Sequence, residues 1–236
     1  MNFEGGTMKR TISALVLMFA LALPVPASTT KECDRVENAG RVTHEIMDIP
    51  DDIPQSVIDK ADCVVVLPSV VKAAFVFGAS YGRGVMTCRG GADFRGPWGA
   101  PTMMALEGGS FGFQVGVQAT DFVLLLMNER AASGILVSKV KLGGDASAAA
   151  GPVGRSASAE TDATIRAEIL SYSRARGLFA GVSLTGSTLR ADNNANRSLY
   201  RKDLSAQDIV LNGKIAPSPC AKQLLESLTK HSPRHT

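Results

Sequence analysis

The sequence has few of the residues that build metal centres. It contains three histidines in 236 residues, at His44, His231 and His235, and four cysteines that are not spaced as paired ligands. Protein zinc sites use clustered cysteine and histidine ligands. We therefore expect no metal site, and nothing in the sequence indicates another cofactor.

A strong excess of either charge is also missing. The chain has 25 Lys and Arg against 22 Asp and Glu, a formal net charge of +3, and the two signs are interspersed. Proteins that bind nucleic acid normally show a basic field that neutralises phosphates. The sequence therefore argues against a nucleic-acid partner.

One long apolar run is present, Ile12–Leu23, and it lies at the N-terminus after Lys9 and Arg10. Small residues follow at 25–27, which is typical of a secretory signal peptide cleaved after Ala27. Its twelve residues are fewer than the roughly 20 that a membrane-spanning helix needs. We expect a signal peptide over 1–27 and a periplasmic or secreted product of bacterial type, not lipid-anchored because Cys33 does not directly follow the run.

An even number of cysteines in an oxidising compartment permits two disulfides. Cys63 and Cys88 each border a predicted strand, and a hairpin folding near Phe75 would align them, which favours this pair. Cys33 and Cys220 would then tie the terminal helices together. Free buried thiols are the alternative, because a core of this size does not need covalent links.

Period-two alternation dominates the middle of the chain, whereas helical spacing occurs near its ends. Asn128 and Asp192 are placed as helix N-caps. Helices are predicted over 32–47, 54–60, 128–136, 192–200, 206–211 and 217–230, and strands over 64–67, 75–81, 102–106, 111–117, 122–127, 139–142, 146–150, 166–173 and 178–189. Without regular strand-helix alternation, this order predicts an α+β fold: a mainly antiparallel curved sheet or barrel-like β-core flanked by short helices.

Small residues are concentrated on part of this core. On the predicted strand 111–117, Phe111 and Val117 share one face, while Gly112 and Gly116 share the other. Two interpretations remain open for the small-residue surface: an acyl-chain groove with Phe111 or Phe179 at its edge, or close packing of another element, which is favoured. The residues of this possible groove are Gly112, Gly116, Phe179 and Gly181, together with Ala148 and Ala150.

Four motifs recur in the order found in a known family. They are DIPQSVIDKADCVVVLPSVVKAAFVFGASYGRGVM, WGAPTMMALEGGSFGFQVGVQATDFVLLLMN, DASAAAGPVGR and SYSRARGLFAGVSLTG. With these motifs, the chain from Asp52 to Gly213 resembles the SYLF domain family. The resemblance implies binding to phosphoinositide membranes, as in eukaryotic members, and to actin, as in fungal members. It assigns 52–213 to a SYLF-like domain, 28–51 to an N-terminal helix and linker, and 214–236 to a C-terminal helix and tail.

Family members bind lipid partly through a basic amphipathic helix at the start of the domain, but here residues 31–52 are acidic. Anionic headgroups require a basic face, so we expect lipid contacts from the β-core instead. The candidate phosphate-binding residues are Lys72, Arg83, Arg155, Arg174 and Arg176. The alternative is a solvated sheet face whose arginines pair with acidic neighbours such as Glu168.

Two further motifs match patterns that carry chemistry in other proteins. Gly108–Gly112 fits G-x-S-x-G, but Ser110 lies in strand-like alternation rather than in the strand-to-helix turn of a serine hydrolase. Gly151–Arg155 could surround an anion, although a hairpin turn is favoured. No catalytic residue is assigned.

We expect an exported, non-catalytic module that binds phosphoinositide or another anionic phospholipid; the alternative is a structural or envelope-interaction protein without a specific ligand. Actin is not expected as a partner of an exported protein.

Overall fold

A twisted, curved sheet forms the centre of the computed structural model, which describes residues 27–49, 53–74, 77–111, 116–152, 166–175, 178–181, 184 and 186–233. Within these residues the nine-stranded sheet has the order β5-β9-β3-β2-β1-β4-β7-β6, with β8 beside β7. The strands are β1 (Cys63–Ala74), β2 (Phe77–Cys88), β3 (Thr102–Phe111), β4 (Gly116–Leu126), β5 (Val140–Lys141), β6 (Ala148–Ala150), β7 (Ile169–Ala175), β8 (Leu178–Gly181) and β9 (Ser187–Ala191). All neighbours are antiparallel except β6 and β7.

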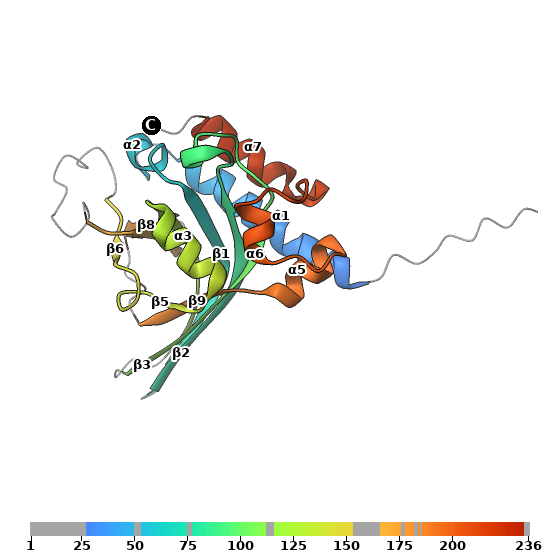
Figure 1. The fold of residues 1–236 in the computed structure, drawn as a ribbon. Coiled ribbons are helices and arrows are strands. Elements are labelled where there is room, and N and C mark those ends of the chain that lie inside the picture. The colour runs from blue at the N-terminus through green and yellow to red at the C-terminus, as the bar shows by residue number, and fades with distance from the viewer. Residues whose placement is uncertain are drawn as a thin grey trace, which may run out of the picture.

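Helices cover one end of the long strands on both sides. They are α1 (Ala27–Met47), α2 (Gln55–Ile58), α3 (Glu129–Val137), α5 (Asn193–Tyr200), α6 (Ala206–Val210) and α7 (Lys222–His231), with 3-10 turns η1 (Ala92–Phe94) and η3 (Pro219–Ala221). Helix α1 packs on β1 and β2 and carries α7, whereas α3 packs on β9 and β4 from the other side (Figure 1). This arrangement confirms the predicted α+β class with a curved, mainly antiparallel sheet.

Local sequence signals set the helix starts. The Asn128 side chain accepts a hydrogen bond from the Ala131 amide at 2.9 Å, and the Asp192 side chain accepts one from the Ala195 amide at 3.2 Å. Each cap satisfies an amide group that the first helical turn leaves without a partner. Both N-caps are those predicted from the sequence.

The centre of the core lies where β1 and β4 are covered on both faces. Val64–Leu67 and Phe122–Leu126 are all at most 1% exposed. A bulge then interrupts β1 after Leu67, where the register against β4 shifts. Ser69 has a φ of 50°, and its amide donates to the Asp121 carboxylate at 2.8 Å. The bulge therefore separates the buried part of β1 from the part that follows.

Two strand predictions are wrong. The predicted strand 111–117 spans the end of β3 and the start of β4, which are separated in the sheet by β2 and β1. The predicted strand 178–189 is divided between β8, next to β7, and β9, next to β3. In both cases the period-two alternation occurs on both sides of a connection, so local pattern alone cannot show that the chain has moved to another part of the sheet.

Both cysteine pairs favoured from the sequence are disulfides in the structure. Cys63 and Cys88 are register partners on β1 and β2, and Cys33 on α1 is joined to Cys220 on η3. Among the described residues, no helix is both long enough and apolar enough to cross a membrane. The signal peptide predicted over 1–27 lies almost wholly outside the described residues.

Helices α1 and α7 meet at a carboxylate. Asp48 lies 3.1 Å from the His44 ring, 2.9 Å from the His231 ring and 3.0 Å from the Lys230 ammonium. The hydrogen bond from Lys230, with further help from His231 and the nearby positive charges, lowers the pKa of Asp48 below its ordinary value of 3.8. Asp48 therefore ties the ends of the two helices together as long as it is ionised.

Replacing Asp48 with asparagine is expected to remove a pH-dependent part of the stability. A lowered carboxyl pKa stabilises the folded state above the unfolded pKa, and this contribution disappears as pH falls through the folded pKa. The wild type should therefore unfold at higher temperature than Asp48→Asn near neutral pH, and the difference should begin to shrink near about pH 4 and disappear as the pH falls through the lowered pKa of Asp48. Thermal unfolding from pH 2 to 7 measures this, with the exposed Asp34→Asn on the same helix as control. A difference that stays constant with pH would contradict the assignment.

Candidate functional site

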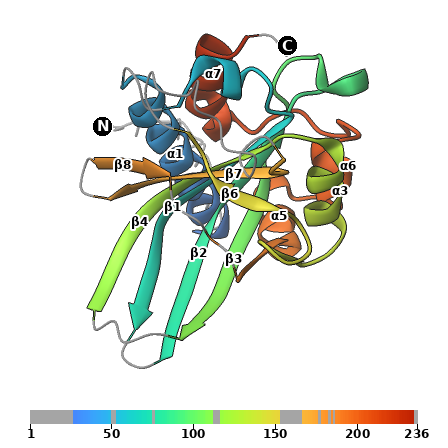
Figure 2. The ribbon, with the colours of Figure 1, turned by 90° about the vertical axis from the view of Figure 1, so that its left-hand side faces the viewer.

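Strands β1 to β4 continue past the helices and form a projecting end, which we call the blade (Figure 2). It comprises the described residues 71–74, 77–82, 107–111 and 116–120. Register partners on neighbouring strands lie on the same face of a sheet, as do residues two apart on one strand. The pairings therefore place Glu107, the register partner of Tyr81, on the same face as six apolar side chains: Val71, Ala73, Ala79, Tyr81, Val117 and Ala119.

This set, which we call the apolar face, is open to solvent. Val117 is 78% exposed, Tyr81 47% and Val71 43%, and the three alanines are also exposed. Large apolar side chains gathered on a surface commonly mark a binding site. The opposite face of the blade carries Lys72, Ser80 and Gln118 among glycines, so the two faces differ in chemistry.

Lys72 and Glu107 are the only charged residues within the ranges that make up the blade. Neither Ala73–Gly82 nor Gly108–Thr120 contains a lysine, arginine, aspartate or glutamate. These tracts supply all four long strands of the blade, including Phe77 and Phe111, which are register partners. A soluble protein usually protects exposed sheet with charged side chains. The blade lacks this protection.

Three arginines lie where the blade meets the helix-covered part of the sheet, on the same face as the apolar residues; we call Arg83, Arg174 and Arg190 the arginine belt. Each is paired with a carboxylate. Arg83 lies 3.3 Å from Asp192, Arg190 donates to Glu107 at 2.6 Å, and Arg174 contacts Glu45 of α1. Hydrogen bonding to the Tyr81 hydroxyl, with the nearby Asp192 charge, raises the pKa of Arg83.

Lys72 lies on the opposite face. Its ammonium nitrogen is 4.9 Å from the centroid of the Phe122 ring, and burial lowers the pKa of the side chain. Within the described part of the chain, no acidic side chain forms an ion pair with it. A cation–π contact compensates part of the cost of removing the ammonium from water.

The structure brings together only some of the predicted phosphate-binding residues. Arg83 and Arg174 share a face of the sheet, but Lys72 lies on the other, so the three do not form one patch. Arg155 and Arg176 lie outside the described residues. The alternative of paired arginines holds for Arg83 and Arg174, although the partners are Asp192 and Glu45; Glu168 instead lies 3.6 Å from Arg130. Arg190 was missed because the predicted strand stopped at Leu189.

The predicted glycine-bordered groove is not formed as one surface. Gly116 pairs with Ala74 at the start of β4, and Gly181 pairs with Tyr172 at the end of β8. Following the registers across β4 and β7 places these two glycines on opposite faces of the sheet. Phe179 on β8 is the register partner of Arg174 on β7. Gly112 lies outside the described residues. Gly116 therefore cannot line a common groove with Gly181.

Close packing against a glycine is seen at Gly151, which is not one of the residues of the predicted small-residue surface. A Cβ atom at this position would lie 2.1 Å from the ring of Tyr172, which is 0% exposed. Glycine is needed here because the ring occupies the space of a side chain. The anion-binding turn proposed for Gly151–Arg155 falls mostly outside the described residues.

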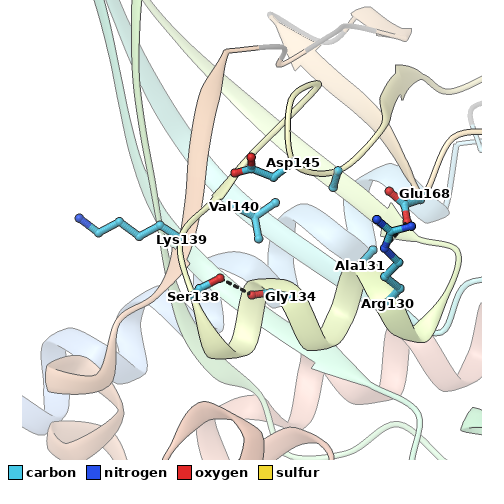
Figure 3. A pocket seen from close by; sticks show the side chains of 9 residues that line it. Arg130, Ala131, Gly134, Ser138, Lys139, Val140, Asp145 and Glu168 are labelled. Atoms are coloured by element: carbon cyan, nitrogen blue, oxygen red, sulfur yellow. Dashed lines mark hydrogen bonds and ion pairs between the residues drawn. The ribbon is translucent and has the colours of Figure 1, made fainter.

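A polar cavity of about 220 Å³ lies beside α3 (Figure 3). Its two carboxylates are already engaged: Asp145 accepts from the Lys141 amide at 2.8 Å, and Glu168 accepts from the Ser147 amide at 3.1 Å. The Ser138 hydroxyl is turned toward the Gly134 carbonyl (Figure 3). The lining residues are Arg130, Ala131, Gly134, Ser138, Lys139, Val140, Asp145, Ala146 and Glu168. They include no nucleophile paired with a base, so the cavity offers no catalytic arrangement.

The serine of the G-x-S-x-G match lies inside a strand. Ser110 pairs with Gly78 near the end of β3, and the next described element is strand β4 rather than a helix. The described histidines, His44 and His231, are at the junction with Asp48. This placement contradicts a strand-to-helix nucleophile turn and agrees with the interpretation as strand.

Comparison with known proteins places a chain with this curved sheet and projecting blade in a family. Residues 107–231 match Ysc84, the family described as Las17-binding protein actin regulator. The chain belongs to this Ysc84 (SYLF) family, which confirms the resemblance seen in the motifs. Among its relatives is SH3 domain-containing protein PJ696.02 of Schizosaccharomyces pombe, 37% identical over 214 residues, covering 87% of this chain and 48% of that protein.

Other relatives carry similar names. Protein YSC84 of Saccharomyces cerevisiae is 34% identical over 211 residues (87% of this chain, 44% of that protein). Human SH3 domain-containing YSC84-like protein 1 is 32% identical over 216 residues (88% and 61%). The chain therefore spans about half the length of the fungal relatives. These names describe binding or regulatory proteins rather than enzymes.

Proposed function

We propose that this chain is an exported, non-catalytic module that binds membranes containing phosphoinositide or another anionic phospholipid. The observation that carries the proposal is the arginine belt at the base of an exposed blade whose only charged residues are Lys72 and Glu107. Arginine binds phosphate in bidentate geometry, and each cation near an anionic membrane surface contributes about 1 kcal/mol. Export follows from the signal peptide expected over 1–27, which places the module at an envelope or extracellular membrane.

Each belt arginine must exchange a carboxylate for a lipid phosphate. This exchange costs least where the ion pair is open to solvent, because such a pair contributes only about 0–1 kcal/mol. The Arg174 and Glu45 side chains are 21% and 42% exposed, whereas the Asp192 partner of Arg83 is only 11% exposed, so the Arg174–Glu45 pair is the easier one to separate. The carboxylates of Glu45 and Asp192 therefore act as competitors of the headgroup.

Flotation with lipid vesicles tests the proposal. Residues 28–236 should float with vesicles containing phosphatidylserine or a phosphoinositide, and much less with pure phosphatidylcholine. Added salt should weaken flotation, because screening reduces the attraction between the belt and the headgroups. If the chain floats with no anionic lipid, the proposal is wrong, and an envelope-interaction protein without a specific ligand becomes the better description.

The Arg174–Glu45 pair offers a matched test. Arg174→Gln and Glu45→Gln remove the same ion pair, so both should change the thermal unfolding midpoint similarly. Their lipid binding should change in opposite directions: Arg174→Gln should bind anionic vesicles about fivefold more weakly, since one membrane-facing cation is lost, while Glu45→Gln should bind more tightly. Vesicle titration measures both. If both variants bind more weakly to the same degree, the pair has only a structural role.

The family description favours a second candidate, actin binding, because relatives 33–34% identical to this chain are Protein YSC84 and LAS seventeen-binding protein 3 of yeast. Cosedimentation with filamentous actin distinguishes the two candidates. Saturable cosedimentation together with failure to float with anionic vesicles would favour actin.

A further inference from the structure

We infer that the end of the blade enters the boundary between headgroups and acyl chains of one bilayer leaflet, with the apolar face in contact with hydrocarbon. This inference rests on the proposed function and extends it, because the belt accounts for headgroup binding whereas the blade determines orientation and depth. The occupant of the apolar face is thus the acyl layer of a membrane. The argument depends on how the side chains are layered along the strands.

Three layers follow one another from the end of the blade toward the helices. Val117 with Ala73 and Ala79 forms the outermost described layer of the apolar face, and Tyr81 with Val71 and Ala119 forms the next. Arg83 follows two residues after Tyr81, and its side chain donates to the Tyr81 hydroxyl. Two residues of a strand span about 7 Å. Glu107, the register partner of Tyr81, lies in the second layer and accepts a hydrogen bond from Arg190. The order is therefore apolar, then aromatic with a polar tip beside a paired carboxylate, then arginines paired with carboxylates.

This order matches the chemistry of a leaflet. Acyl chains accept aliphatic side chains, tyrosine is enriched at the interface, and arginine reaches the phosphates. A protein partner fits less well, because a stable protein interface uses about 20–30 residues on each side, whereas the apolar face has six, three of them alanine. The tracts Ala73–Gly82 and Gly108–Thr120 contain no charged residue. This composition is expected for contact with lipid rather than with a charged protein surface.

The open edges of the blade limit its depth. Among the described strands, β9 pairs with β3 only over 104–108, and β7 pairs with β4 only over 121–126. The outer edges of Gly109–Phe111 and Gly116–Thr120 therefore have no strand neighbour in the described part of the sheet. Backbone groups without partners are excluded from the hydrocarbon core, and this cost exceeds the gain from a few aliphatic side chains. Insertion should stop at about 5–10 Å, the depth of interfacial elements.

Tryptophan fluorescence measures this depth. Trp98 is the single tryptophan, 6% exposed, and lies beyond the opposite end of β2. In the wild type it should not be quenched by vesicles of phosphatidylserine with brominated acyl chains. Val117→Trp should be quenched strongly, and Tyr81→Trp more weakly because it lies one layer nearer the belt. Val137→Trp, on α3 at a site that is 69% exposed, should remain unquenched.

Aspartate substitutions provide a second readout. Val117→Asp should weaken vesicle binding roughly tenfold, since it replaces an inserted aliphatic group with a charge, whereas the equally exposed control Val137→Asp should bind like the wild type. If the wild type floats but Val117→Trp is not quenched, the inference is wrong while the proposed function stands. If Val117→Asp converts a dimer to a monomer in sedimentation and binds vesicles normally, the apolar face is a subunit interface and the inference is also wrong. Absence of any vesicle binding overturns both.

Discussion

Gly84→Ala is expected to destabilise the protein by about 3 kcal/mol or more, the upper range for overpacking a core. A Cβ atom on Gly84 would lie 1.9 Å from the Val66 carbonyl oxygen and 2.8 Å from its carbonyl carbon. These are backbone atoms at the start of the β1 bulge, so they cannot rotate away as a side chain would. Strands β1 and β2 would have to separate in the centre of the core.

Chemical denaturation measures the loss, and Gly109→Ala is the matched control. Gly109 lies on the neighbouring strand β3, and the nearest atom to a Cβ there is the Gly78 carbonyl oxygen at 3.9 Å, which is an ordinary contact. The free energy of unfolding of Gly109→Ala, obtained from its denaturation midpoint, should differ from that of the wild type by no more than about 0.5 kcal/mol. Equal midpoints for the two variants would show that β1 accommodates the extra atom by a shift that the structure does not suggest.

Arg89→Ala is expected to cost about 3–5 kcal/mol, as for removal of one partner from a buried charge network. Arg89 is 1% exposed, lies 4.2 Å from the Trp98 ring centroid, and donates to the Ser232 carbonyl at 2.8 Å. The Ser232 hydroxyl donates in turn to Asp59 at 2.6 Å. Burial lowers the pKa of Arg89, and the charges of Asp59 and Asp62 oppose this shift. Its removal leaves acidic groups without their cation.

Trp98 makes this change visible, because its indole nitrogen donates to the same Ser232 carbonyl at 3.1 Å. Arg89→Ala should shift the fluorescence of this single tryptophan and lower the denaturation midpoint. Arg95→Ala, an exposed arginine in the same loop, should change neither. A midpoint for Arg89→Ala equal to that of Arg95→Ala would show that the buried guanidinium contributes nothing to stability.

Gly84 and Arg89 both lie at the helix-covered end of the sheet, where β1 and β4 are buried on both faces. The blade beyond the bulge is exposed on one face and has open edges. Substitutions such as Val117→Asp should therefore change lipid binding with little change in stability. This separation allows the proposed membrane contact to be tested without unfolding the protein.

Local signals in the sequence determined the α+β class, the caps at Asn128 and Asp192, the continuously apolar part of β4 and the favoured pairing of Cys63 with Cys88. Each depends on neighbours a few residues apart or on a single hairpin. The lack of charge in Ala73–Gly82 and Gly108–Thr120 was also present in the sequence, although its meaning depended on where the strands lie.

Tertiary structure alone decided the order of the strands and the face on which each side chain lies. Period-two alternation is the same whether a strand continues or turns back, so Phe111 and Val117 were assigned to one strand when they belong to β3 and β4. For the same reason, the sequence predicts one strand over 178–189 where the structure has β8 and β9, and it predicts one surface for Gly116 and Gly181, which lie on opposite faces. Packing of α1 on the sheet brought Glu45 to Arg174, and the start of α5 after β9 brought Asp192 to Arg83. Sheet register, which depends on pairing between distant segments, collected the apolar side chains of the blade on one face.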